Sequence, residues 1–154
     1  MVVIKEDYIV EISSVRSLDG EKDEVSIKTV GNINKVGDKI YITYNEYSDD
    51  NPEIFRTCIV KIEEKSNTVT LIKNGARGQT KLIWQKGQRH YCPYYIEYGM
   101  INVGIFTNDI KCELDEDGGK LYIKYSIDVN GSSLGITEIT VSAKRKSKRR
   151  CKGV

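Results

Sequence analysis

Long apolar runs are missing from this chain, and so are the motifs that mark most enzymes and metal sites. No apolar stretch approaches the ~20 residues of a membrane-spanning helix. The chain has one histidine and four cysteines, none in C-x-x-C spacing. It also has no nucleophile elbow and no phosphate-binding loop. The sequence therefore predicts no catalytic residue, no metal and no cofactor, and no motif in it supports an enzyme.

The size and the amino terminus indicate an ordinary cytoplasmic domain. The 154 residues suit a single domain, which buries roughly 70% of its unfolded surface without needing disulfides. The start, MVVIKEDYIVEISS, lacks the long apolar core and cleavage site of a secretory signal. We therefore expect a cytoplasmic protein whose four cysteines are free thiols.

Turn-forming residues recur at short intervals, and the segments between them are rich in Val, Ile, Thr and Tyr. This arrangement predicts about ten strands joined mostly by hairpins. Asn130-Gly131 fits a type I′ turn, in which both central residues have positive φ. In KLYIKYSIDV, every second residue from Leu121 to Val129 is apolar, as in an antiparallel strand with one face buried.

Three segments change the phase of this alternation, around residues 25–30, 101–114 and 134–143. Such changes are typical of β-bulges, where one extra residue bends the strand. Long bent strands turn corners and help a sheet to close. The sequence thus predicts an all-β fold, an antiparallel closed barrel of about 8–10 strands over residues 1–143, in preference to a sandwich.

The order of these features resembles a known family. KIYITYNEY is followed by an acidic loop, then by TCIVKI, VTLIKNG and LIWQKG, an aromatic strand ending in Tyr98-Gly99, and INVGIFTNDIKCELDEDGGKLYIKYSIDVNG. Over residues 8–143 the chain is similar to the YwiB-like family, a domain of unknown function numbered 1934. The resemblance implies a calycin-like or lipocalin-like barrel, and it brings no established activity.

One aromatic strand carries the candidate ligand site. In strand geometry His90, Cys92, Tyr94 and Tyr98 share one face, while Tyr91 lies on the other. If the first face lines a hollow barrel, His90, Tyr94 and Tyr98 form a pocket for a small amphiphilic molecule, since tyrosine supplies most of the aromatic residues. The alternative is a barrel wall packed by tyrosines whose hydroxyls find partners. His90 and Cys92 could also ligate zinc, but two further ligands are not evident.

The carboxyl terminus, residues 144–154, is a short basic tail that we expect to be disordered, since it has no apolar face to bury. It holds seven Lys and Arg residues, and without them 17 basic residues face 22 acidic ones, so the body carries −5. The tail is either a solvated end or a contact for RNA or the ribosome; the lack of an apolar face argues against membrane binding. The candidate phosphate contacts are Lys144, Arg145, Lys146, Lys148, Arg149 and Arg150.

Overall fold

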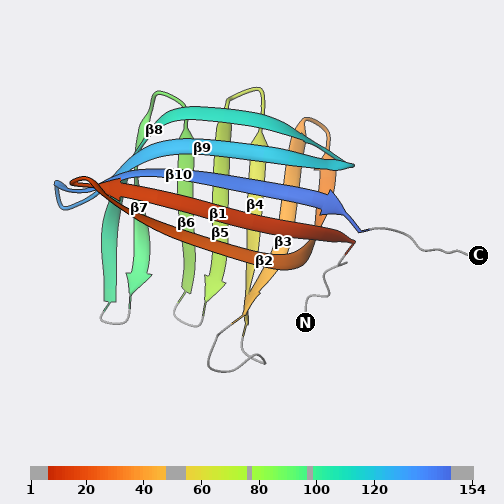
Figure 1. The fold of residues 1–154 in the computed structure, drawn as a ribbon, viewed down its shortest axis with the longest axis horizontal. Helices are drawn as coiled ribbons and strands as arrows, with labels where there is room; N and C mark the ends of the chain where they lie inside the picture. Colours follow the sequence, from red (N-terminus) through yellow and green to blue (C-terminus); the bar gives the residue numbers. More distant parts are fainter. Residues whose placement is uncertain (1–6, 48–54, 76–77, 97–98, 147–154) are drawn as a thin grey trace, which may run out of the picture.

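The fold is an antiparallel sheet of ten strands that curls on itself (Figure 1). It is given by a computed structural model, which describes residues 7–47, 55–75, 78–96 and 99–146. The strand order is β6-β5-β4-β3-β2-β1-β10-β9-β8-β7. The strands are β1 (Tyr8–Leu18), β2 (Glu21–Val36), β3 (Lys39–Tyr47), β4 (Phe55–Glu63), β5 (Thr68–Gly75), β6 (Gly78–Gln85), β7 (Arg89–Ile96), β8 (Gly99–Asp115), β9 (Gly118–Val129) and β10 (Ser132–Arg145).

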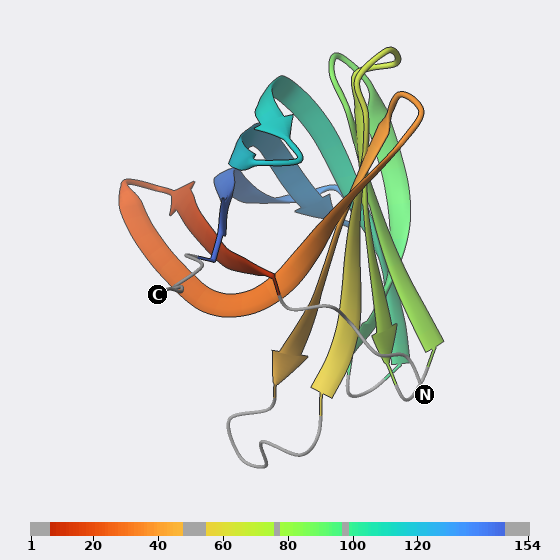
Figure 2. The same ribbon diagram turned by 90° about the vertical axis from the view of Figure 1, so that its right-hand side faces the viewer.

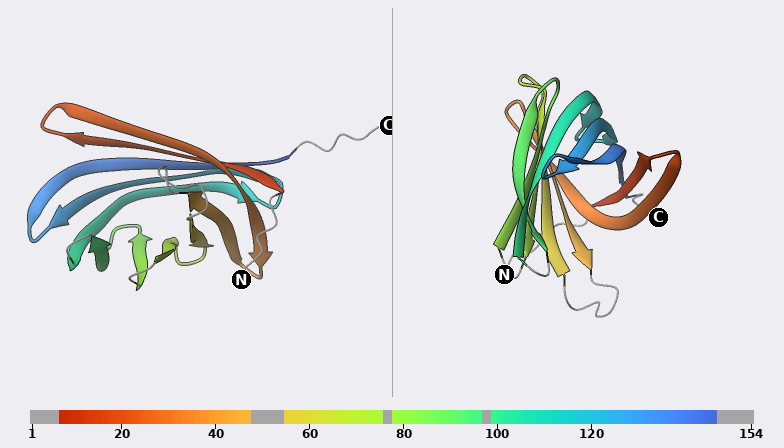
Figure 3. Two further views of the ribbon diagram at one scale, coloured as in Figure 1. Left: turned by 90° about the horizontal axis from the view of Figure 1, so that it is seen from below. Right: turned by 90° about the vertical axis from the view of Figure 1, so that its left-hand side faces the viewer.

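The strands form two layers that cross steeply. The shorter strands β3 to β7 stand side by side, and the long strands β8, β9, β10, β1 and β2 arch across them (Figures 2 and 3). β2 and β8 bend from one layer into the other and so join them (Figure 1). The edge strands β6 and β7 lie next to each other, and the Gly87 amide bonds the Thr107 carbonyl at 2.9 Å where their turn meets β8. The predicted antiparallel barrel is confirmed as a nearly closed one.

Two of the three predicted bulges are present. The β8–β9 register shifts between Thr107 and Asp109, and the β10–β9 register shifts between Ser133 and Ile136. The bulge predicted near residues 25–30 is wrong, because β2 pairs with both neighbours without a register shift. The phase change there has another origin: β2 leaves β1 and joins β3 at Gly31, where the chain bends between the layers.

The hairpin turns follow their sequence signatures. Asn130 and Gly131 have φ of 52° and 82°, which confirms the predicted type I′ geometry. Asp19 and Gly20 repeat the same pair of positive φ angles, 51° and 82°, between β1 and β2. These turns hold the long strands in antiparallel register over most of their length.

The inward faces of both layers meet in one apolar core. Alternation decides which side chains enter it, so the odd-numbered residues of β9 from Leu121 are inside, as the sequence pattern predicts. The largest fully buried side chains of the core are Ile40, Ile42, Ile62, Ile105, Leu121 and Ile123. The described part of the chain holds no helix that is long and apolar enough to cross a membrane.

The last strand extends into the segment assigned to the basic tail. β10 includes Lys144 and Arg145, and Arg145 is the ladder partner of Tyr8. The guanidinium of Arg145 lies 4.9 Å from the centre of the Tyr8 ring and donates to the Glu116 carbonyl at 2.9 Å. Tyr8 donates its hydroxyl to the same carbonyl. Arg145 therefore ties the β8–β9 turn to the barrel, and the domain continues two residues beyond the boundary predicted at 143.

Candidate binding site inside the barrel

Strand β7 presents its even-numbered face to the interior, which decides between the two faces that the sequence left open. Cys92 is fully buried, and His90 and Tyr94 beside it are half-buried. On the opposite face Tyr91 is 69% exposed. Pro93 lies in an edge strand, which is where a residue without an amide hydrogen is tolerated. The alternation thus separates an interior row, which can meet a ligand in the barrel, from an exterior one.

The structure places two of the three predicted ligand residues. The His90 Nε2 lies 3.0 Å from the Gln85 Oε1, so a side chain near the end of β6 orients the imidazole. Tyr94 packs against the core from the same side. Tyr98 lies outside the described residues. His90 and Tyr94 therefore share one wall, and no group of three or more His, Cys, Asp or Glu within the described ranges is arranged to hold a metal ion.

The middle of the interior contains polar atoms that the sequence did not single out. The rings of Trp84 and Tyr125 are 5.5 Å apart between centroids, and Thr107 is the ladder partner of Tyr125. The Trp84 Nε1 and the Thr107 Oγ1 are buried and have no hydrogen-bond partner among the described residues. Burial raises the pKa of Tyr125 to about 12, so its hydroxyl stays protonated at neutral pH. These groups form a donor-rich centre in an apolar surrounding.

Toward one end of the barrel several inward-facing apolar side chains are less covered, although Tyr44, Cys58 and Thr80 at the same end are buried. The successive ladder pairs on β5 and β6 are Val69 with Trp84, Leu71 with Leu82, and Lys73 with Thr80. The first pair is almost completely buried, whereas Leu71 and Leu82 are half-buried although they face inward. The same intermediate burial recurs across the barrel at Tyr94, Ile101, Ile127 and Val129. We call this incompletely covered part the mouth of the barrel, at the end where β3 finishes and β4 begins.

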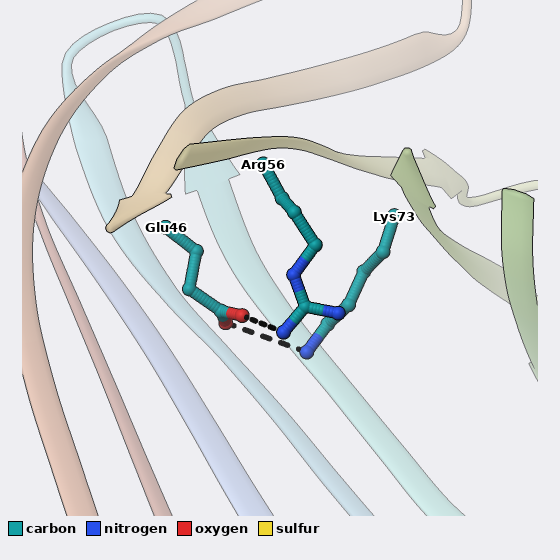
Figure 4. A network of polar contacts seen from close by, with 3 residues as sticks. All are labelled: Glu46, Arg56 and Lys73. Carbon is teal, nitrogen blue, oxygen red and sulfur yellow. Dashed lines mark hydrogen bonds and ion pairs between the residues drawn. The ribbon is translucent and has the colours of Figure 1, made fainter. Parts of the chain in front are cut away.

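A charged cluster lies at the mouth, on three neighbouring strands (Figure 4). The Glu46 carboxylate accepts from the Arg56 Nη2 at 2.8 Å and pairs with the Lys73 Nζ at 3.4 Å. The side chains of Glu46 and Lys73 are only 25% and 19% exposed. Register fixes their direction, because Lys73 is the partner of the buried Cys58, and Glu46 follows the buried Tyr44 by two residues. The cluster therefore lies on the inner face of the sheet.

Beneath the cluster, Tyr44 and Cys58 form a second polar pair. They are cross-strand partners, and a side-chain hydrogen bond joins the Tyr44 hydroxyl and the Cys58 sulfur. Burial is the largest cause that raises the pKa of both groups, and the Glu46 carboxylate acts in the same direction, although Lys73 and Arg56 partly oppose the rise at Cys58. Both therefore remain neutral at physiological pH, and the charges of the mouth come from Glu46, Arg56 and Lys73.

The described residues also line a pocket of about 150 Å³ on the other side of the barrel centre. Its apolar and polar walls include Ile62, Val69, Ile110, Glu63, Glu64 and Cys112. Val69, which forms part of the pocket wall, is the ladder partner of Trp84 on β6. A cavity of this size is comparable to one that accommodates benzene. The barrel thus has free volume at this end, beside the turn between β4 and β5.

The basic residues of the chain end divide into two groups. Lys144 and Lys146 are exposed, whereas Arg145 also pairs with Asp117 at 3.8 Å and takes part in the turn contacts given above. Lys148, Arg149 and Arg150 lie outside the described residues. A phosphate contact by the described end of the chain would thus fall mainly to the two lysines.

The fold and its interior define a class, the nearly closed antiparallel β-barrels with a calycin-like shape. Within that class the chain belongs to the family described as "Domain of unknown function (DUF1934)", whose model matches residues 10–141. This confirms the resemblance identified from the sequence. The chain is 24% identical over 131 residues to "Uncharacterized beta-barrel protein YwiB" of Bacillus subtilis (strain 168), covering 85% of this chain and 88% of that protein.

A solved structure has the same fold. The "Crystal structure of ywiB protein from Bacillus subtilis" superposes with a TM-score of 0.78 and 22% sequence identity, over 91% of this chain and 92% of the other. At this level of identity the likeness establishes the architecture. The function must be argued from the residues inside the barrel.

Proposed function

We propose that this protein binds a small amphiphilic molecule inside its barrel. The observation that carries the proposal is that the buried Trp84 Nε1 and Thr107 Oγ1, which have no hydrogen-bond partner within the described ranges, lie in the same interior as incompletely covered apolar side chains. A buried donor without a partner costs about 1–3 kcal/mol, and an acceptor on a bound molecule removes that cost. The half-buried Leu71 and Leu82 offer the apolar surface that the rest of such a molecule requires.

The neighbouring space supports the same proposal. Val69, the ladder partner of Trp84, also lines the pocket of about 150 Å³, so the core beside the indole borders free volume. Tyr94 and His90 supply polar tips on apolar bodies along the adjoining strand β7. We also propose that the protein is cytoplasmic, as the sequence predicts. The free thiols of Cys58, Cys92 and Cys112 support this location.

The test uses Trp84, the one tryptophan of the chain, as a reporter. Titration with 1-octanol and with sodium octanoate should change its fluorescence saturably. Leu71→Phe, which fills the mouth, should weaken binding of both compounds at least about tenfold. Ile72→Phe adds the same volume on the outer face of the same strand and should leave binding unchanged. Equal effects of the two variants, or no saturable change in the wild-type protein, would refute the proposal.

A second candidate function is contact with RNA or the ribosome through the basic chain end. It is favoured by the exposed Lys144 and Lys146, which continue directly from β10 toward the remaining cations. Lysines neutralise phosphates without reading sequence, so such binding would be weakened steeply by salt. This candidate is independent of the barrel interior, and its test follows in the Discussion.

A further inference from the structure

We infer that the amphiphile carries an anionic head group, a carboxylate or a phosphate, and that Arg56 and Lys73 bind it at the mouth of the barrel. The inference rests on the proposed function and adds the chemistry of one end of the ligand. It starts from the charge balance of the cluster in Figure 4, where two cations share one carboxylate. The cluster therefore carries a net charge of +1.

An excess positive charge in this position is unusual, because it lies on the inner face of a sheet. Partly buried charges are stabilised when they are paired, since the surrounding protein replaces only part of their hydration. Lys73 is 19% exposed and its single ion pair among the described residues is with Glu46, at 3.4 Å. Glu46 is engaged at the same time by Arg56 at the shorter distance of 2.8 Å.

No neighbouring group on the described inner face supplies the missing negative charge. The Tyr44 hydroxyl and the Cys58 thiol lie directly below the cluster, but burial keeps both protonated. Thr80, the ladder partner of Lys73, is neutral. Arg56 has five N–H donors and Lys73 three, so both retain hydrogen-bonding capacity for the oxygens of an external anion.

The position of the cluster fits the head group of a molecule whose body lies inside the barrel. Along β5, Lys73 is two residues from Leu71 and four from Val69, which separates it from the Trp84 level by roughly 13 Å. Between them lies the half-buried pair Leu71 and Leu82. Along the inner wall, from the mouth toward the centre, a ligand therefore meets first a cation, then an apolar stretch and then the donor-rich centre.

The experiment compares probes that differ only in the head group, using Trp84 fluorescence at low ionic strength. Sodium octanoate or octyl phosphate should bind at least about tenfold more tightly than 1-octanol, which corresponds to 1.4 kcal/mol. The anion that binds with the higher affinity shows whether the site suits a carboxylate or a phosphate. Added salt should reduce the preference for anions, because it screens partly exposed charges.

Substitutions in the cluster should act in opposite directions. Lys73→Gln should remove most of the preference for the anionic probes, while Glu46→Gln should strengthen their binding, because the carboxylate that competes for both cations is gone. Lys81→Gln, which removes an exposed outward-facing lysine on β6, is the matched control and should change nothing. Thermal melts identify any variant that fails to fold, and the salt dependence of the wild-type protein then remains as the test.

The outcomes separate this inference from the proposed function. Binding of 1-octanol and the anions with equal affinity would overturn the inference and leave the proposed function standing. A weaker affinity for anions in Glu46→Gln would also overturn the inference. If none of the three probes binds, both fail together.

Discussion

Gly31→Ala is expected to destabilise the barrel at the point where β2 passes from one layer to the other. Gly31 pairs with Tyr8 on one side and with Tyr44 on the other, so both ladders constrain its backbone. A Cβ added at residue 31 would lie 2.3 Å from the Thr43 carbonyl oxygen and 3.1 Å from the Tyr44 Cβ. The near atom belongs to the backbone and cannot rotate away. Overpacking of this kind costs about 1–3 kcal/mol.

For a chain of this length, that cost lowers the melting temperature by roughly 2–12 °C, which calorimetry resolves. Gly104→Ala is the matched control, since its Cβ would meet the Asp128 Oδ1 at 2.4 Å, the far end of a side chain. Asp128 can move at the cost of its ion pair with Arg89, an exposed contact worth about 0–1 kcal/mol. Both variants replace a glycine with alanine, so they lower the conformational entropy of the unfolded chain to the same extent. Equal melting temperatures for the two variants would refute the argument that Gly31 is needed for close approach of the strands.

Three further predictions concern pH, thiols and the chain end. Burial raises the pKa of Tyr125 from 10.0 to about 12, so the stability this group contributes is complete below about pH 10 and is lost as pH rises to about 12. We would measure the free energy of unfolding by urea titration across that pH range. It should fall by about 3 kcal/mol less in Tyr125→Phe than in the wild type, and equal falls would contradict the raised pKa of Tyr125. Under native conditions a thiol reagent should label the partly exposed Cys112 faster than the buried Cys58 and Cys92. In denaturant without reductant, the same reagent should titrate four thiols per chain. A count of two would indicate a disulfide. If the tail binds mixed-sequence RNA, deletion of 147–154 combined with Lys144→Gln and Lys146→Gln, which spares the length of β10, should abolish binding whose log affinity falls with log salt by about 0.7 per phosphate contacted; equal binding by both forms would exclude the tail.

Much of the fold was predictable because it depends on local patterns. Alternation placed the odd-numbered residues of β9 inside, and phase changes located the bulges near Thr107 and Ser133. The failure at β2 is instructive, since a change of partner strand produces the same shift of pattern as a bulge. A bulge and a change of partner strand differ only in which distant strands pair, and the sequence of one strand does not determine that. The end of β10 was likewise missed because Arg145 is held by contacts to Tyr8 and Glu116, distant in sequence.

The candidate site was predictable only in part. Alternation shows that His90 and Tyr94 share one face of β7, but only the structure shows that this face is the inner one. The charged cluster left a signal that was overlooked: Glu46 continues the inward parity of Ile40, Ile42 and Tyr44. Its partners Arg56 and Lys73 come from two other strands, and their convergence depends on register. The unpaired indole of Trp84 is a property of the packed interior and has no counterpart in the sequence.

The most direct test of binding inside the barrel is the indole N–H signal of Trp84 in a nitrogen–proton correlation spectrum. The chain has one tryptophan, so the spectrum contains one such signal and its assignment is unambiguous. During titration with sodium octanoate the signal should shift progressively and saturate, because the ligand enters the space around a buried donor that lacks a partner. The shift should be much reduced in Leu71→Phe and retained in Ile72→Phe. An indole signal that stays in place in the wild-type protein throughout the titration would contradict binding in the interior.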